Sequence, residues 1–193
     1  MSFKKLFIIL ALLLLCALNA SAQGGKCNLK LAQLKPAPEL HGLRIGMSVE
    51  QVKGLMPWVE TLREDDLGFS TTSFSPDFNP KIDKAAYAGV RTVTLEFLDG
   101  KLFTIWIGFN DSFKWKTLEE FVPGMSAELG LAPGVWSADS SKPSIECDDF
   151  ELNAQMIGQG PSLHLLDKNA RELWEERRTQ KEEKRSEQEK DEP

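Results

Sequence analysis

The sequence contains few of the side chains that usually carry catalysis or bind metals. It has 2 histidines and 3 cysteines, and no Cys-x-x-Cys pair that would indicate a redox motif. Two distant cysteines with only His41 and His164 do not have the spacing of a zinc site. The Gly-x-Ser-x-Gly elbow, the phosphate loop, the dinucleotide fingerprint and the His-Glu-x-x-His helix are also missing. We therefore expect a protein that is not an enzyme and that binds no metal and no cofactor.

Basic residues are outnumbered. The chain has 23 Lys and Arg against 29 Asp and Glu, a formal net charge of −6. Without the predicted export signal, which contains Lys4 and Lys5, 21 basic residues face 29 acidic ones and the charge becomes −8. Nucleic acids and anionic membrane surfaces are bound through basic patches. The composition therefore argues against a nucleic-acid partner.

The first 22 residues have the pattern of a signal peptide. Lys4 and Lys5 precede thirteen apolar residues, 6–18, and Ala20-Ser21-Ala22 supplies the small side chains that a signal peptidase reads. An apolar run that crosses a membrane needs about 20 residues. We expect cleavage after Ala22, no membrane span in the mature chain, and a periplasmic or secreted location.

Export would place Cys27 and Cys147 in an oxidising compartment, where a disulfide can persist. One interpretation is a disulfide that ties the N-terminal arm to a late strand and closes a loop of more than a hundred residues, worth roughly 4 to 5 kcal/mol in chain entropy. The other is two unpaired thiols, with Cys147 packed as a small apolar residue. The sequence leaves both open.

The mature chain divides into three parts. Residues 23–39 are polar, end in Pro36-Ala37-Pro38 and predict an extended arm. Residues 40–174 are predicted to form a single α+β domain. Residues 175–193 contain no apolar side chain, so this tail cannot bury a surface, and we expect a solvated helix extension or a disordered tail.

The first helix is predicted at residues 49–56. Ser48 is placed to cap it together with Gln51, Met47 to pack on Val52, and Pro57 to end it. Gly46 precedes this start signal.

A second helix is predicted to begin at a capping box of Thr117 and Glu120 and to end at Gly130, with Pro123 kinking or splitting it. A last helix is expected to start at Asp167.

Two hairpins are predicted. Residues 91–109 alternate apolar and polar around Asp99-Gly100, and residues 150–156 and 163–165 do so around Gly158 to Pro161. Residues 60–88 are rich in turn formers, and within them only 69–74 predict a strand. We expect an antiparallel sheet of four to six strands with two packed helices.

The register of the first hairpin decides which side chains are exposed. A two-residue loop at Asp99-Gly100 would pair Phe97 with Leu102 and put the two apolar rows on opposite faces. A three-residue loop with Gly100 in the left-handed region pairs Leu95 with Phe103 and buries both rows together, so we expect this register. The opposite face then carries a mixed polar and aromatic surface: Thr92, Thr94, Glu96, Leu102, Thr104 and Trp106.

Gly46-Met47-Ser48 with Val52, followed by a helix, a hairpin, a helix and strands in an exported chain, resembles the SmpA/OmlA/BamE-like and β-lactamase-inhibitory-protein-like superfamily. The resemblance implies a helix and antiparallel-sheet fold in which these four residues have a structural role. A second Gly124-Met125-Ser126 is similar to the tandem repeat of the inhibitory proteins. A lipidated cysteine, as in the outer-membrane assembly branch, is not expected here.

These features predict a non-enzymatic protein-interaction module of the bacterial envelope or extracellular space, in envelope assembly or as an enzyme inhibitor. Trp106 is the expected anchor because Trp and Tyr side chains dominate protein contacts. His164 is expected to be a partly exposed strand residue. The alternative function is a small-molecule carrier or hydrolase with a cleft beside the 60–88 loop.

Overall fold

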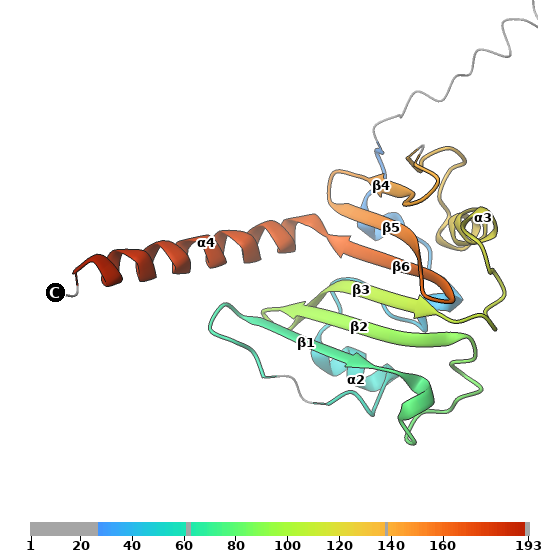
Figure 1. The fold of residues 1–193 in the computed structure, drawn as a ribbon, viewed down its shortest axis with the longest axis horizontal. Helices are drawn as coiled ribbons and strands as arrows, with labels where there is room; N and C mark the ends of the chain where they lie inside the picture. The colour runs from blue at the N-terminus through green and yellow to red at the C-terminus, as the bar shows by residue number, and fades with distance from the viewer. Residues whose placement is uncertain (1–26, 61–62, 138, 192–193) are drawn as a thin grey trace, which may run out of the picture.

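The protein is described by a computed structural model over residues 27–60, 63–137 and 139–191. The predicted signal peptide, 1–22, lies outside the described residues. The fold is a six-stranded antiparallel sheet in the order β1-β2-β3-β6-β5-β4 (Figure 1). The strands are β1 (Phe69–Phe74), β2 (Val90–Leu98), β3 (Lys101–Phe109), β4 (Ser144–Glu146), β5 (Phe150–Ile157) and β6 (Gly160–Asp167). The helices are α2 (Val49–Leu55), α3 (Leu118–Leu129) and α4 (Lys168–Asp191), with short 3₁₀ turns at Leu31–Gln33, Pro38–Leu40 and Pro76–Phe78. The α+β class with a sheet of four to six strands is confirmed.

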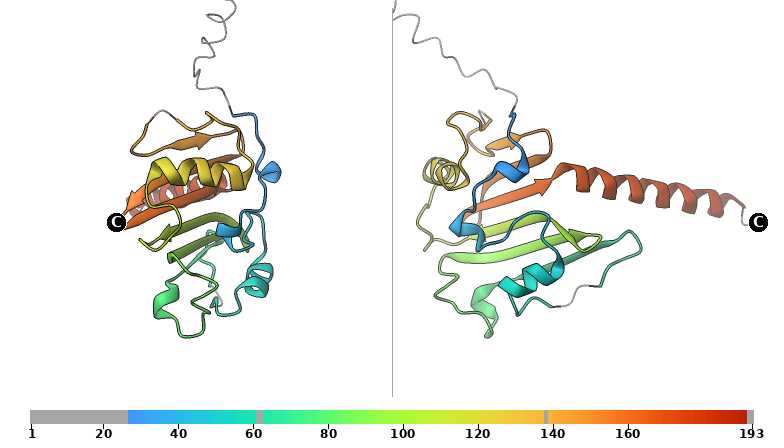
Figure 2. Two further views of the ribbon diagram at one scale, coloured as in Figure 1. Left: turned by 90° about the vertical axis from the view of Figure 1, so that its right-hand side faces the viewer. Right: turned by 180° about the vertical axis from the view of Figure 1, so that it is seen from behind.

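One face of the sheet forms the main core together with α2, α3 and the N-terminal arm. Figure 2 shows the arm and α2 on the same side of the sheet. Val52 of α2 packs in one cluster with Met56, the residue that follows α2, with Phe121 of α3 and with the inward side chains of the strands. The amphipathic pattern of the short helices is therefore explained by a single apolar contact surface.

The Gly46-Met47-Ser48 turn begins α2 and also fastens it to the sheet. Ser48 Oγ accepts from the Gln51 amide at 3.3 Å, and the Gln51 side chain accepts from the Ser48 amide at 2.8 Å. Gly46 has φ +86°, a conformation that glycine adopts without steric cost. The Gly46 amide donates to Leu102 O, and the Leu102 amide donates to Met47 O. The predicted cap is confirmed, and the helix ends one residue earlier than expected.

The predicted register of the first hairpin is wrong. Asp99 and Gly100, with φ +49° and +69°, form a two-residue loop that pairs Phe97 with Leu102. Positive φ at both loop residues is typical of a type I′ turn, whose twist matches that of the strands. The register then shifts, because Glu96 pairs with Thr104 and leaves Phe103 as the extra residue of a bulge.

The bulge reverses the faces of two apolar side chains. Leu102, expected on the contact face, is 1% exposed and lies in the main core. Phe103, expected in the main core, is 3% exposed within a second, smaller cluster. After the bulge the alternation resumes, so Ile105 and Ile107 return to the main core. The bulge at Phe103 therefore allows the two-residue turn and the buried row of apolar side chains to exist together.

The second hairpin is confirmed, since β5 and β6 pair from Phe150 with Asp167 to Ile157 with Gly160. The second helix is also confirmed. Thr117 caps α3 and Gly130 ends it with φ +73°. Pro123 lies within one continuous helix, so it does not split α3 in two. The Glu120 carboxylate accepts from the Lys116 amide. Gly124 lies inside α3, whereas Gly46 precedes α2, so the two Gly-Met-Ser segments differ in structure.

The last helix, α4, starts where Asp167 Oδ1 accepts from the amides of Asn169 and Ala170. It projects beyond the sheet (Figure 1), so the helical alternative for the charged tail is observed as far as Asp191. Arg177 donates to both Asp99 carboxylate oxygens at 2.8 Å, and this ion pair lowers the pKa of Asp99. The contact fastens α4 to the turn of the first hairpin.

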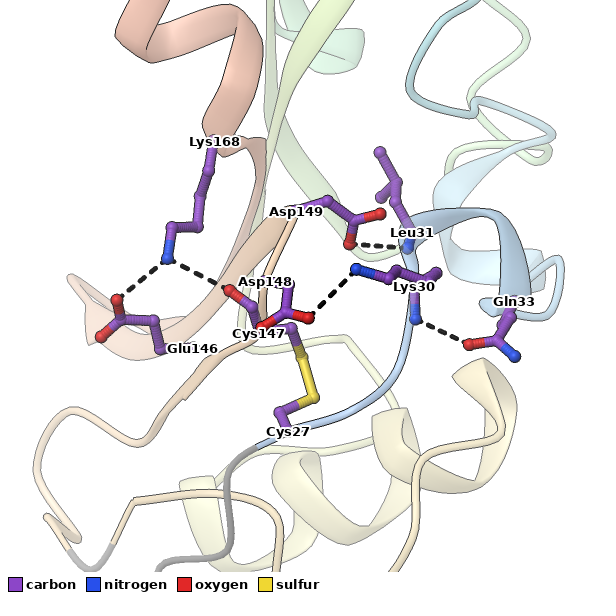
Figure 3. Close-up of a disulfide and its surroundings, with 9 residues drawn as sticks. All are labelled: Cys27, Lys30, Leu31, Gln33, Glu146, Cys147, Asp148, Asp149 and Lys168. Carbon is purple, nitrogen blue, oxygen red and sulfur yellow. Dashed lines mark hydrogen bonds and ion pairs between the residues drawn. A yellow bond between two sulfur atoms is a disulfide. The ribbon is translucent and has the colours of Figure 1, made fainter.

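A disulfide joins Cys27 to Cys147, so the paired alternative is observed (Figure 3). Close to it, the Leu31 amide donates to Asp149 Oδ1 at 3.0 Å, and Lys30 Nζ lies 3.1 Å from Asp148 Oδ2. The arm is thereby held against the turn between β4 and β5.

Candidate functional site

The open face of the sheet, opposite the arm and α2, carries most of the predicted contact residues. Ser73, Thr94, Trp106, His164 and Asn153 are register partners across five strands. Trp106 stands near the centre of this row and is 38% exposed. A half-exposed indole on a sheet face offers a large apolar contact with a polar rim, as in protein interfaces.

The predicted contact residues differ in how exposed they are and in which face of the sheet they occupy. Thr92, Thr94 and Glu96 are half-buried on the open face, with the Thr94 hydroxyl 3.0 Å from Ser73 Oγ. Thr104 is on this face but only 2% exposed. Leu102 is not part of the face, because the bulge turns it into the main core.

A groove of about 290 Å³ lies where the start of α4 crosses the open face. Four aromatic side chains line it: Phe69, Phe103, Trp106 and Trp174. Its polar lining consists of Glu96, Thr104, His164 and Arg171, and Leu166 completes the wall. The alternation along 91–109 predicts Glu96, Thr104 and Trp106 as contact residues. It does not predict the other aromatic residues, because the bulge and the docking of α4 bring them to the groove.

Two polar atoms beside the groove are buried without a partner. Thr104 Oγ1 and Trp174 Nε1 form no hydrogen bond among the described residues. A buried hydroxyl or indole N–H without a partner costs about 1 to 3 kcal/mol, and such atoms in native proteins are few. A bound molecule that supplied partners would recover part of this cost.

The charges around the groove are unequally compensated. Arg171 Nε donates to Glu175 Oε1 at 2.9 Å. For the Glu96 carboxylate, the described part of the chain contains no hydrogen bond or ion pair within the usual distances. One negative charge is therefore left open beside the aromatic walls.

His164 lies next to Trp106, with 5.6 Å between the ring centroids. Burial lowers the pKa of His164, although the carboxylates of Glu96 and Glu151 act in the opposite direction. The imidazole is therefore neutral near pH 7 and can both donate and accept a hydrogen bond. Taken together, the groove combines aromatic walls with a neutral imidazole, an unpaired carboxylate and an unpartnered hydroxyl.

Among residues 27–60, 63–137 and 139–191, no helix is both long and apolar enough to cross a membrane. Comparison with protein-family models, curated proteins and solved structures finds no significant match to this chain. The resemblance to the SmpA/OmlA/BamE-like and β-lactamase-inhibitory-protein-like superfamily therefore stays a prediction.

Proposed function

We propose that the chain is an exported, non-enzymatic protein-interaction module whose partner is an envelope or extracellular protein. The contact surface is the open face around Trp106. The observation that carries this proposal is a tryptophan 38% exposed in the middle of a sheet, on the face opposite the arm and α2.

Contacts around the indole support this assignment. Trp106 lies between Thr94 and His164 on the neighbouring strands, and the Thr94 hydroxyl is already held by Ser73. Side chains fixed before binding lose little conformational entropy when a partner docks. Trp is also among the residues that contribute most to protein interfaces. The surface therefore has a preformed aromatic anchor with a polar rim.

The test is site-specific photo-crosslinking in the native envelope. A photo-reactive amino acid replaces Thr94 on the open face, and in a control it replaces Leu55, which is exposed on α2. We expect Thr94 to yield a defined protein adduct that Leu55 does not, and we expect Trp106→Ala to remove that adduct.

Thermal unfolding of the Trp106→Ala variant is the control for this experiment. Trp106→Ala should keep a cooperative thermal transition within a few degrees of the parent, because more than a third of the side chain already contacts water. The proposal is refuted if Trp106→Ala leaves the adduct yield unchanged, or if the Thr94 and Leu55 positions give the same adducts.

A second candidate function is a carrier for a small apolar molecule. An apolar hollow of about 460 Å³ lies between the arm and the main core, with Leu31, Leu34, Ile45 and Leu129 in its lining. This volume is within the usual range for small-molecule sites, about 300 to 1,000 Å³. This hollow lies beside the arm, and a separate, more open hollow of about 600 Å³ lies beside the 60–88 loop, lined in part by Trp58, Glu60 and Lys81. Binding of an apolar fluorescent probe that Leu34→Glu abolishes would support this function.

A further inference from the structure

We infer that the groove beneath α4 is a pocket for a cationic side chain, lysine or arginine, of the protein partner. This inference rests on the proposed function and specifies the chemistry that the open face recognises.

The size of the groove suits a single side chain. Its volume of about 290 Å³ is at the lower end of the range for whole small molecules. Its roof is held in place, because Trp174 packs on Phe69 with 5.3 Å between ring centroids and Arg177 binds Asp99. The pocket is therefore formed before a partner arrives.

The walls favour a cation with an apolar stem. Lysine and arginine bury their methylene groups along apolar surfaces, and aromatic faces attract their charged heads. Arg178 already lies over the Trp174 ring, 5.1 Å from its centroid. Over the Trp106 ring, the described residues place no Lys or Arg group at such a distance. The Trp106 face is thus the one available to a partner's cation.

Polar residues line the same groove. Glu96 supplies the carboxylate whose charge is not compensated, and its register partner Thr104 on the neighbouring strand has a buried hydroxyl without a partner. Arg171 opposes a cation, but Glu175 binds it at the rim.

The experiment records the indole N–H signals of the full mature protein by two-dimensional ¹H–¹⁵N NMR. The probes share one apolar stem: n-butylammonium and n-butylguanidinium are cations, 1-butanol is neutral, and butyrate is an anion. We expect both cations to shift the Trp106 and Trp174 signals in a saturable manner. Butanol should bind much more weakly and butyrate not at all.

Matched variants assign the charge. Glu96→Gln should weaken cation binding about tenfold, as expected for the loss of a charge-assisted hydrogen bond. Glu151→Gln removes the same charge on the open face outside the groove and should change affinity less than about twofold, the scale of a screened surface charge. Arg171→Gln should tighten binding. Thr104→Val removes only the hydroxyl and should weaken binding without altering the dispersion of the spectrum.

The inference is overturned if butanol binds as tightly as butylammonium, if Glu96→Gln and Glu151→Gln have equal effects, or if Arg171→Gln weakens binding. Failure of this inference and failure of the proposed function are distinguishable. If Glu96→Gln leaves the Thr94 adduct unchanged, the cation pocket is refuted and the interaction surface stands. If cations bind but Thr94 yields no protein adduct, the assignment to a protein partner is refuted and the groove is a site for small organic cations.

Discussion

The disulfide between Cys27 and Cys147 allows a quantitative prediction. The two cysteines are 120 residues apart, so the bond closes most of the chain into a loop. The chain-entropy relation for a loop of this length gives roughly 5 kcal/mol at 25 °C, and native disulfides typically contribute about 2 to 5 kcal/mol. We expect the double variant Cys27→Ala and Cys147→Ala to lose stability within that range. Alanine is chosen because both positions are buried and a serine hydroxyl would add a desolvation cost.

The polar contacts beside the disulfide are too weak to replace it, although Leu31 and Ala37 of the arm also pack on the main core. The ion pair of Lys30 with Asp148 joins two exposed side chains, and pairs of this kind contribute about 0 to 1 kcal/mol. The hydrogen bond from the Leu31 amide to the Asp149 carboxylate contributes about 1.5 to 3 kcal/mol. Without the disulfide, the amide of Leu31 should therefore exchange with solvent faster than amides in β5.

The assay is urea unfolding of three samples in one buffer: the oxidised protein, the reduced protein and the double variant. The reduced protein and the double variant should agree with each other, and both should unfold at a lower midpoint than the oxidised protein. A loss of less than about 0.5 kcal/mol, the usual scale of a surface substitution, would refute the entropic argument. It would show that the arm docks through its non-covalent contacts alone.

Three further predictions test the register, the titration of the open face and one close packing contact. Leu102→Ala should lower the free energy of unfolding by about 2 to 5 kcal/mol, the cost of truncating a core side chain; a change below about 0.5 kcal/mol in urea unfolding would place Leu102 on the surface. Burial lowers the pKa of both His41 and His164, so the unfolded chain takes up protons at a higher pH than the folded one, and the free energy of unfolding should fall as the pH drops below about 6.5. His164→Gln should reduce this pH dependence in urea titrations between pH 5 and 7.5. An unchanged pH dependence would contradict the prediction. Gly124→Ala should lower the melting temperature, since its Cβ would overlap the Trp115 indole, whereas an unshifted melting curve and unchanged fluorescence would show that Trp115 moves aside freely.

Elements that depend on neighbouring residues were predictable. The Ser48 and Gln51 side chains that cap α2 are three positions apart. In α3, Thr117 accepts a hydrogen bond from the Glu120 amide, which is also three positions away. The two hairpins also follow from short-range alternation and turn residues. These signals act within one turn of chain, so they need no information about the rest of the fold.

Other features depend on segments that are far apart in the sequence. The pairing of Cys27 with Cys147 and the short strand β4 depend on the arm lying beside the β4–β5 turn. The groove likewise needs Trp174 from α4 beside Trp106 from β3. Trp106, Thr104 and Glu96 were predictable because they alternate on one strand pair, whereas the α4 side of the site depends on where that helix docks.

The sequence by itself determined the class of the fold, the location of the two hairpins along the chain, the helix starts and the position of Trp106 on the polar face. The tertiary structure alone decided the bulge at Phe103, which exchanged Phe103 with Leu102 between the two faces. A strand can satisfy its alternation in more than one register, and only the packing of α4 against one face and of α2 against the other distinguishes them. The free energy that selects between registers comes from contacts across the whole sheet, which no local stretch of residues contains.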